Sequence, residues 1–252
     1  MQNDLDILRR AVDGAQEARD AERLASILGD AHEADIAAIL GDLENAEKRW
    51  TVFSAIRDDA QAARTLIECR EDVADEILTR LPPDRLTVLL EEMHPDDRAD
   101  ILGLMDRTAA AVQLAELPAE ERGEANELLR YPDESAGGLM TPDFFWVRTG
   151  ATANEAIERL RAAKDVEEIA YIYVLDDAMR LQGVASIRDL LTHPAHSTVG
   201  SFMTTAIHSV SPDTDQEEVA RRVARYNLVA LPVVAADGRM LGVITVDDVI
   251  DV

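Results

Sequence analysis

The chain has 252 residues, of which 50 are Asp or Glu and 25 are Lys or Arg, so its formal net charge is −25. This charge disfavours nucleic acid and anionic lipid as partners and favours cations. Hydrophobic residues make up 47% of the sequence, enough to build packed cores, so the chain is not a disordered acidic polymer.

The location is predicted to be intracellular. The single cysteine, Cys69, cannot form an internal disulfide, which fits a reducing compartment. The N-terminal stretch lacks the apolar core of a signal peptide, and no apolar run approaches the ~20 residues that a membrane-spanning helix needs. We therefore expect this chain to be soluble.

Residues 1–130 are predicted to form an acidic, all-helical domain. Leu5, Leu8 and Val12 follow one another at steps of three and four residues, which places them on one face of a helix. Three later segments begin with proline followed by acidic residues, at Pro83, Pro95 and Pro118. Proline and acidic side chains both suit the first turn of a helix. We expect a superhelical stack of short helices.

Residues 131–252 contain an internal repeat. The segment 183–191, GVASIRDLL, aligns with 242–250, GVITVDDVI, at an offset of 59 residues. Each copy is predicted to contain a helix, a strand, a tight turn, a second strand and a Ser/Thr-x-x-Asp helix start. The first repeat covers about 138–199 and the second about 200–252. This half is therefore predicted to be a duplicated α/β unit.

The repeat resembles a tandem pair of cystathionine-β-synthase (CBS) domains, whose signature includes the glycine, two apolar residues and Ser/Thr-x-x-Asp. The segment 128–142, LLRYPDESAGGLMTP, and the segment 214–220, TDQEEVA, are more specific. Together with the acidic helical domain, they resemble the cytosolic region of MgtE-type magnesium transporters. The fold class implied is α plus α/β: an N-terminal all-helical superhelical domain followed by a tandem CBS pair.

The resemblance also implies partners and a location. In that family a connecting helix and a transmembrane pore domain follow the second repeat, so the chain resembles an excised regulatory region or a truncated homologue at the cytoplasmic face of the membrane. CBS pairs commonly dimerise, so we expect a homodimer formed through the CBS domains, and no nucleic acid partner.

An acidic pair marks the first candidate metal site. Asp96 and Asp100 are four residues apart at a helix start, so their carboxylates lie on one face. Taken alone, they fit either a Mg²⁺ site or an acidic first turn that complements the helix dipole. The resemblance implies Mg²⁺ bridging from this pair to Asp248 and Asp251, with Asp247 beside them.

A second acidic patch comprises Asp215, Glu217 and Glu218. The resemblance implies Mg²⁺ between CBS domains at these positions, although helix capping and solvation also explain them. The family's Tyr-Asp-Phe, expected in the following helix, is Tyr226-Asn227-Leu228 here. Asn227 offers a neutral carbonyl oxygen in place of a carboxylate, so this site is expected to be weaker or altered.

An adenine nucleotide such as ATP is a further candidate ligand. In nucleotide-binding CBS domains the Asp of Ser/Thr-x-x-Asp meets the ribose and the hydroxyl meets phosphate. The resemblance therefore implies roles for Ser186 and Asp189, with Tyr171 near the adenine and Arg188 near phosphate. The same motif is an ordinary helix start.

The remaining chemistry predicts no enzyme. No Cys or third His accompanies His193 and His196, so they are not expected to hold a transition metal. Cys69 lies in a helical segment and fits a core position. The sequence contains no nucleophile elbow, Walker A loop or dinucleotide fingerprint. The expected function is a Mg²⁺ sensor in which Mg²⁺ bridges acidic domains and favours a compact state that closes the pore. The alternative is a freestanding CBS protein that responds to adenine nucleotides and regulates a soluble partner.

Overall fold

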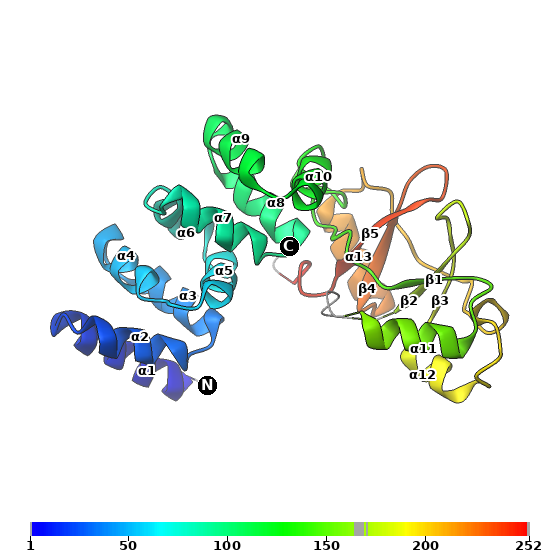
Figure 1. Ribbon diagram of the computed structural model, residues 1–252, viewed down its shortest axis with the longest axis horizontal. Helices are drawn as coiled ribbons and strands as arrows, with labels where there is room; N and C mark the ends of the chain where they lie inside the picture. Colours follow the sequence, from blue (N-terminus) through cyan, green and yellow to red (C-terminus); the bar gives the residue numbers. More distant parts are fainter. Residues whose placement is uncertain (1, 164–168, 170, 251–252) are drawn as a thin grey trace. The chain divides into compact units, whose positions relative to one another are not determined.

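The computed structural model describes residues 2–163, 169 and 171–250. The chain divides into two compact units, residues 1–125 and 126–252, which are described separately below. Figure 1 shows a helical first unit and a second unit that combines strands with helices.

Unit 1 is a stack of short helices, as the sequence predicts. The helix bounds are α1 (Gln2–Glu17), α2 (Ala21–Gly29), α3 (Glu33–Asp42), α4 (Ala46–Ser54), α5 (Asp59–Ile67), α6 (Glu71–Leu78), α7 (Pro83–Glu91), α8 (Pro95–Leu104), α9 (Arg107–Glu116) and α10 (Ala119–Leu128), whose last three residues belong to unit 2. Pro83 and Pro95 are the first residues of α7 and α8, and Pro118 directly precedes α10.

At the start of the stack, α1 packs on α2 and α4, and from α3 to α9 several helices pack with their second neighbours along the chain. Helix α3 packs on α5, α5 on α7 and α7 on α9, while α4 packs on α6. This arrangement buries one apolar face of each helix in a continuous core that includes Leu40, Phe53, Leu66 and Leu89. A stack of this kind is stable because each helix covers the face that its neighbour exposes.

Two buried polar side chains, Gln61 and Arg98, donate hydrogen bonds to carbonyls at the C-terminal ends of α2 and α7. Gln61 Nε2 donates to the carbonyls of Leu28 and Ala31, both at 2.9 Å. Arg98 is 4% exposed, and its Nε and Nη2 donate to Leu90 O at 2.7 Å and Met93 O at 2.8 Å. The carbonyls of Leu28 and Leu90 also accept from the backbone amides of Ala31 at 3.0 Å and Met93 at 3.4 Å, so these side chains add further donors at helix ends, where the last carbonyls lack partners within the helix.

Unit 2 contains two small sheets. The elements are β1 (Trp146–Arg148), α11 (Ala153–Ala162), β2 (Ile172–Leu175), β3 (Leu181–Ala185), α12 (Ile187–Thr192), a 3₁₀ turn (Val199–Ser201), α13 (Gln216–Tyr226), β4 (Ala230–Val234) and β5 (Met240–Thr245). The first sheet has the order β1-β2-β3, with β1 parallel and β3 antiparallel to β2, and the second pairs β4 and β5 antiparallel.

The two repeats exchange their leading segments. Thr141, which precedes the first repeat's strands, pairs with Val243 of the second, with N–H···O distances of 2.8 and 2.9 Å. Thr204, which precedes the second repeat's strands, pairs in the same way with Val184 of the first. The first segment requires glycine beside it, because a Cβ at Gly242 would lie 2.5 Å from Thr141 O; beside the second, a Cβ at Gly183 would lie 2.5 Å from Met203 Sδ. The duplicated unit is therefore one interlocked body.

One predicted helix start differs from the structure. The Thr245-x-x-Asp248 segment leads into a turn over 246–250 within the described residues, whereas Ser186-x-x-Asp189 opens α12. The predicted ligand Asp251 lies outside the described residues.

Candidate metal and nucleotide sites

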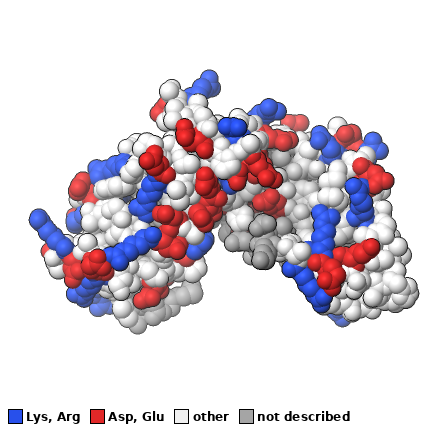
Figure 2. Space-filling model, in the orientation of Figure 1, with Lys and Arg blue, Asp and Glu red and all other residues white. Residues whose placement is uncertain are grey.

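The first acidic pair lies on α8 in unit 1. Asp96 is half-buried in the first turn and Asp100 is exposed one turn further on. Residues four apart on a helix are neighbours, so the structure does bring these two carboxylates to one face. Two carboxylates are enough protein ligands for Mg²⁺, which usually keeps several of its waters. Figure 2 shows acidic and basic side chains interspersed on the visible face.

The second group of acids belongs to unit 2. Asp247 is exposed and Asp248 is half-buried. One oxygen of Asp248 accepts hydrogen bonds from Thr245 N at 3.0 Å and Thr245 Oγ1 at 2.6 Å. Asp248 therefore holds the turn that follows β5.

The structure separates Asn227 from the acids with which it was grouped. Asp215 is the N-cap of α13 and accepts from Glu217 N at 3.0 Å, whereas Asn227 is the C-cap of the same helix, not of a following one. Eleven helical residues span about 16 Å, so Asp215 and Asn227 of one chain cannot bind the same ion. Asn227 adopts a left-handed conformation with φ 51°, which Asn tolerates better than most residues.

The glutamates of α13 have basic partners on their own helix. Glu217 pairs with Arg221 at 3.3 Å, and Glu218 pairs with Arg222 at 2.8 Å and with Arg221 at 3.3 Å. The hydrogen bond from Arg222 is the main cause that lowers the pKa of Glu218. A metal ion at this helix start would compete with these exposed pairs.

The predicted nucleotide residues gather at one end of the first sheet. Ile172 at the start of β2 pairs with Ala185 at the end of β3. Tyr171, which precedes β2, and Ser186, which follows β3, therefore lie at the same open end of the β2–β3 hairpin. Ser186 and Asp189 form a capping box at the start of α12, with Ser186 Oγ donating to Asp189 Oδ2 at 2.6 Å and accepting from Asp189 N at 3.1 Å. That hydrogen bond from Ser186 is the main cause that lowers the pKa of Asp189. Arg188 is exposed beside it.

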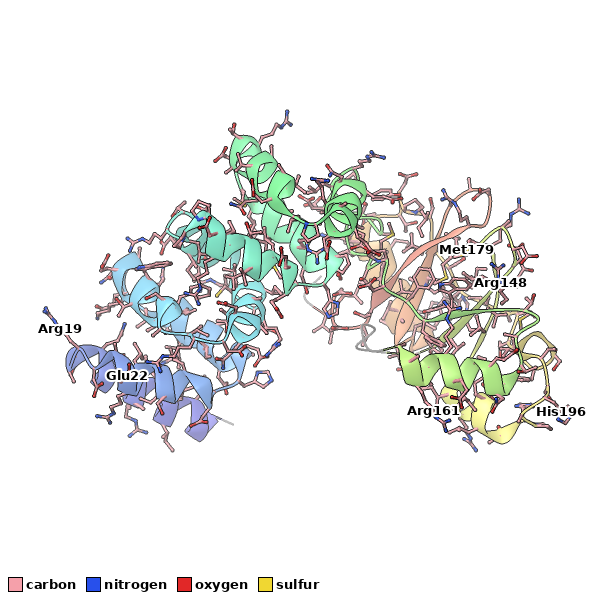
Figure 3. The ribbon with its side chains drawn as sticks, viewed as in Figure 1. Arg19, Glu22, Arg148, Arg161, Met179 and His196 are labelled. Carbon is pink, nitrogen blue, oxygen red and sulfur yellow. The ribbon has the colours of Figure 1, made fainter. Side chains whose placement is uncertain are left out.

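The other titratable candidates have structural contacts. The ring of His193 stacks on Phe202 with centroids 4.1 Å apart, and its Nδ1 lies 2.8 Å from Asp189 O. His196 is exposed, at the position labelled in Figure 3. Burial raises the pKa of the Cys69 thiol to about 12, so this thiol is not a reactive thiolate. Among the residues that the structure describes, no three His, Cys, Asp or Glu side chains form a ready metal cluster.

Two residues outside the predicted sites also stand out. Arg180 and Arg239 pair across the two repeats in an isolated antiparallel bridge. The offset of 59 residues relates them, so the repeat alignment carries the signal that could have found them.

The fold and these sites define a class: a helical domain followed by a tandem CBS pair. Residues 31–134 match the model of the MgtE intracellular N domain, and residues 136–196 and 199–252 match that of the CBS domain. The chain is 40% identical over 237 residues to the magnesium transporter MgtE of Thermus thermophilus, covering 92% of this chain and 52% of that protein. It spans about half the length of the curated relatives it matches.

Solved structures agree with this comparison. The cytosolic domain of the Mg²⁺ channel MgtE in complex with ATP superposes with a TM-score of 0.89 at 39% identity, covering 96% of this chain and 99% of that one. The soluble part of a magnesium transporter gives a TM-score of 0.83 at 28% identity, covering 98% and 97%. The chain belongs to the MgtE family and corresponds to its cytosolic region. Within the described ranges, no helix has the length and apolar character to cross a bilayer.

Proposed function

We propose that this chain is the Mg²⁺-sensing regulatory region of a magnesium channel or transporter whose transmembrane pore domain is its partner. The observation that carries the proposal is the match, over nearly the whole of both chains, to the cytosolic domain of a Mg²⁺ channel. The carboxylate pair on α8 supplies the chemistry, because hard oxygen ligands suit Mg²⁺.

The charge of the chain supplies the switch. At a net charge of −25, the acidic units repel one another when divalent ions are scarce. When Mg²⁺ is abundant, ions shared between Asp96 and Asp100 on one side and Asp247, Asp248 and Asp251 on the other favour a compact state. That state closes the pore, because a ligand shifts an equilibrium toward the conformation that binds it better. The region acts as a homodimer formed through its CBS domains.

The first prediction concerns Mg²⁺ and compaction. Millimolar Mg²⁺ should reduce the radius of gyration in small-angle scattering, and NaCl of equal ionic strength should not. The double variant Asp96→Asn/Asp100→Asn should need at least tenfold more Mg²⁺ for the same compaction, since it removes two carboxylate ligands.

The matched control is Glu71→Gln/Asp75→Asn. These two exposed acids have the same four-residue spacing at the start of α6, so the control removes the same charge from another helix face. If the control shifts the Mg²⁺ response as much as the α8 variant does, the effect comes from the loss of negative charge in general and not from the loss of Mg²⁺ ligands. If Mg²⁺ and NaCl compact the chain equally, the compaction comes from the screening of charge repulsion and not from bridging ions.

ATP is a second proposed ligand, bound at the end of the β2–β3 hairpin. Two observations support it: Tyr171 and Ser186 lie at the same end of that hairpin, and the related cytosolic domain was crystallised with ATP. A chain that responded to ATP but not to Mg²⁺ would instead fit a freestanding CBS regulator of a soluble partner.

The second prediction tests the nucleotide. ATP should raise the melting temperature of the wild-type chain by mass action, with free Mg²⁺ held constant. Asp189→Ala should remove the rise, but it also breaks the cap of α12. Arg188→Gln is therefore the more specific test, because Arg188 is exposed and outside the capping box. This substitution should weaken ATP binding without lowering the melting temperature of the nucleotide-free chain. A rise that survives both substitutions would place ATP elsewhere.

A further inference from the structure

Two arginines of unit 2 lie directly opposite one another. The bridge between Arg180 and Arg239 is flanked by hydrogen bonds from Leu181 N to Gly238 O at 3.1 Å and from Met240 N to Met179 O at 3.0 Å. This pattern is that of a non-hydrogen-bonded antiparallel pair, in which Cα atoms are about 4.5 Å apart and both side chains leave from one face. Both arginines are exposed.

The turns that carry the arginines are held in place. Met179 and Gly238 occupy equivalent repeat positions, and both are left-handed, with φ 60° and 83°. Asp176 Oδ1 accepts from Ala178 N at 2.8 Å and from Arg180 N at 2.9 Å, which fixes the first turn. In Figure 1 the β2–β3 and β4–β5 turns run side by side, and Met179 is labelled in Figure 3. The backbone therefore fixes the spacing of the two arginines.

The pairing brings together two like charges in a chain that has few positive charges. Like charges directly opposite each other in a sheet are unfavourable. Neither guanidinium forms an ion pair with a carboxylate in the part of the chain that is described. Of the nearby acids, Asp177 pairs with Arg148, whereas Asp176 and Asp237 accept from the backbone amides of Arg180 at 2.9 Å and Arg239 at 3.1 Å and not from their guanidinium groups. The two positive charges therefore remain available at a rigid position.

We propose that Arg180 and Arg239 form a binding site for a phosphate group. Two guanidinium forks from one face match the several oxygens of a phosphate, and the bound anion would cancel the repulsion between them. The site is separate from the proposed nucleotide site, because Arg180 and Ser186 flank opposite ends of β3 and the six residue steps between them span about 20 Å. The phosphate group can come from free phosphate or from a lipid headgroup.

The test combines phosphate titration with single and double variants. In chloride buffer, Arg180→Gln or Arg239→Gln should raise the melting temperature by roughly 1–4 °C, because each removes a repulsion. Calorimetric titration with inorganic phosphate should show saturable binding to the wild type and roughly tenfold weaker binding to either variant. Vesicles of phosphatidylcholine with phosphatidic acid, compared with phosphatidylcholine alone, identify a lipid source.

The matched control is Arg19→Gln/Arg161→Gln, which removes two exposed positive charges that do not lie opposite one another in a sheet (Figure 3); of these two, Arg161 pairs with Glu158 at 2.6 Å. This control matters because phosphate stabilises proteins generally through exclusion from their surfaces. The control should keep wild-type affinity for the phosphate group. If Arg180→Gln/Arg239→Gln responds to phosphate and to phosphatidic acid vesicles as the wild type does, the site does not exist. Loss of stability in chloride on replacing either arginine would also overturn it, because the two charges would then not repel.

Discussion

At the scale of single residues, the Ser186–Asp189 pair connects local structure to pH. The Ser186 hydroxyl and amide hold the pKa of Asp189 below its usual range. A carboxylate with a depressed folded-state pKa stabilises the fold above its unfolded pKa, and this stability is lost as the pH falls through the folded value. The capping box should therefore contribute fully at neutral pH and fade below about pH 4.

The third prediction follows from that sign. Ser186→Ala should lower the free energy of unfolding of unit 2 by about 1 kcal/mol at pH 7, the usual contribution of a helix cap. The deficit should shrink in acid, where Asp189 is protonated in both proteins. Urea titrations at several pH values measure it, and Ser186→Thr, which keeps the hydroxyl, is the control. A deficit that is the same at pH 3 and pH 7 would show that the carboxylate is not involved.

At the scale of elements, Arg98 fixes the junction of α7 and α8. Its guanidinium donates to two carbonyls at the end of α7, and its Nη1 lies 3.6 Å from Glu124 Oε2. The fourth prediction is that Arg98→Ala lowers the free energy of unfolding of unit 1 by about 3 kcal/mol, because buried carbonyls lose charged donors. Arg98→Lys should recover only part of the lost stability, since one ammonium group cannot reproduce the two hydrogen bonds of the guanidinium.

Chemical denaturation of the chain checks this prediction through the transition that belongs to unit 1, with Arg107→Ala as the control. Arg107 is exposed at the first position of α9, so its loss should change stability by less than about 0.5 kcal/mol. Similar losses for the two variants would mean that charge, and not the carbonyl contacts, sets the effect.

The same elements show how far the sequence predicts the structure. The starts of α7, α8 and α10 were predictable because proline and acidic residues act within one helical turn. The role of Arg98 was not, since periodicity carries no information about which distant carbonyl a side chain meets. The pairing of Thr141 with Val243, and of Thr204 with Val184, was not predictable either, because it joins segments far apart in the sequence.

The candidate sites follow the same division. Spacing alone placed Asp96 and Asp100 on one helix face, and the repeat alignment showed Ser186 and Asp189 as a helix start, whereas their nucleotide role came from the resemblance to CBS domains. The grouping of Asp215 with Asn227 required knowing where α13 ends, because a helix between two ligands keeps them apart. Short-range geometry was therefore predictable, and the assembly of ligands from several elements was not.

At the scale of the whole molecule, each unit has a core of its own. The main cluster of unit 1 draws its buried members from Val12 to Ala125, whereas clusters in unit 2 draw theirs from Phe145 to Val199 and from Tyr173 to Val243. Units with separate cores can unfold separately, so two-state behaviour is not expected for the chain as a whole.

The fifth prediction uses this independence to test the coupling. In EDTA, calorimetry should show two transitions, and Arg98→Ala should lower only the one that belongs to unit 1. With millimolar Mg²⁺, ions that bind acids of both units stabilise the weaker one by about 1–3 kcal/mol through mass action, so the transitions should move together. NaCl of equal ionic strength should leave the two transitions apart, because monovalent ions screen charges without bridging them.

In Mg²⁺, Arg98→Ala in unit 1 should also lower the transition temperature of unit 2, since the bridging ions are lost when either unit unfolds. If the transition of unit 2 ignores Arg98→Ala at every Mg²⁺ concentration, the ions bind the units separately and the bridge is wrong.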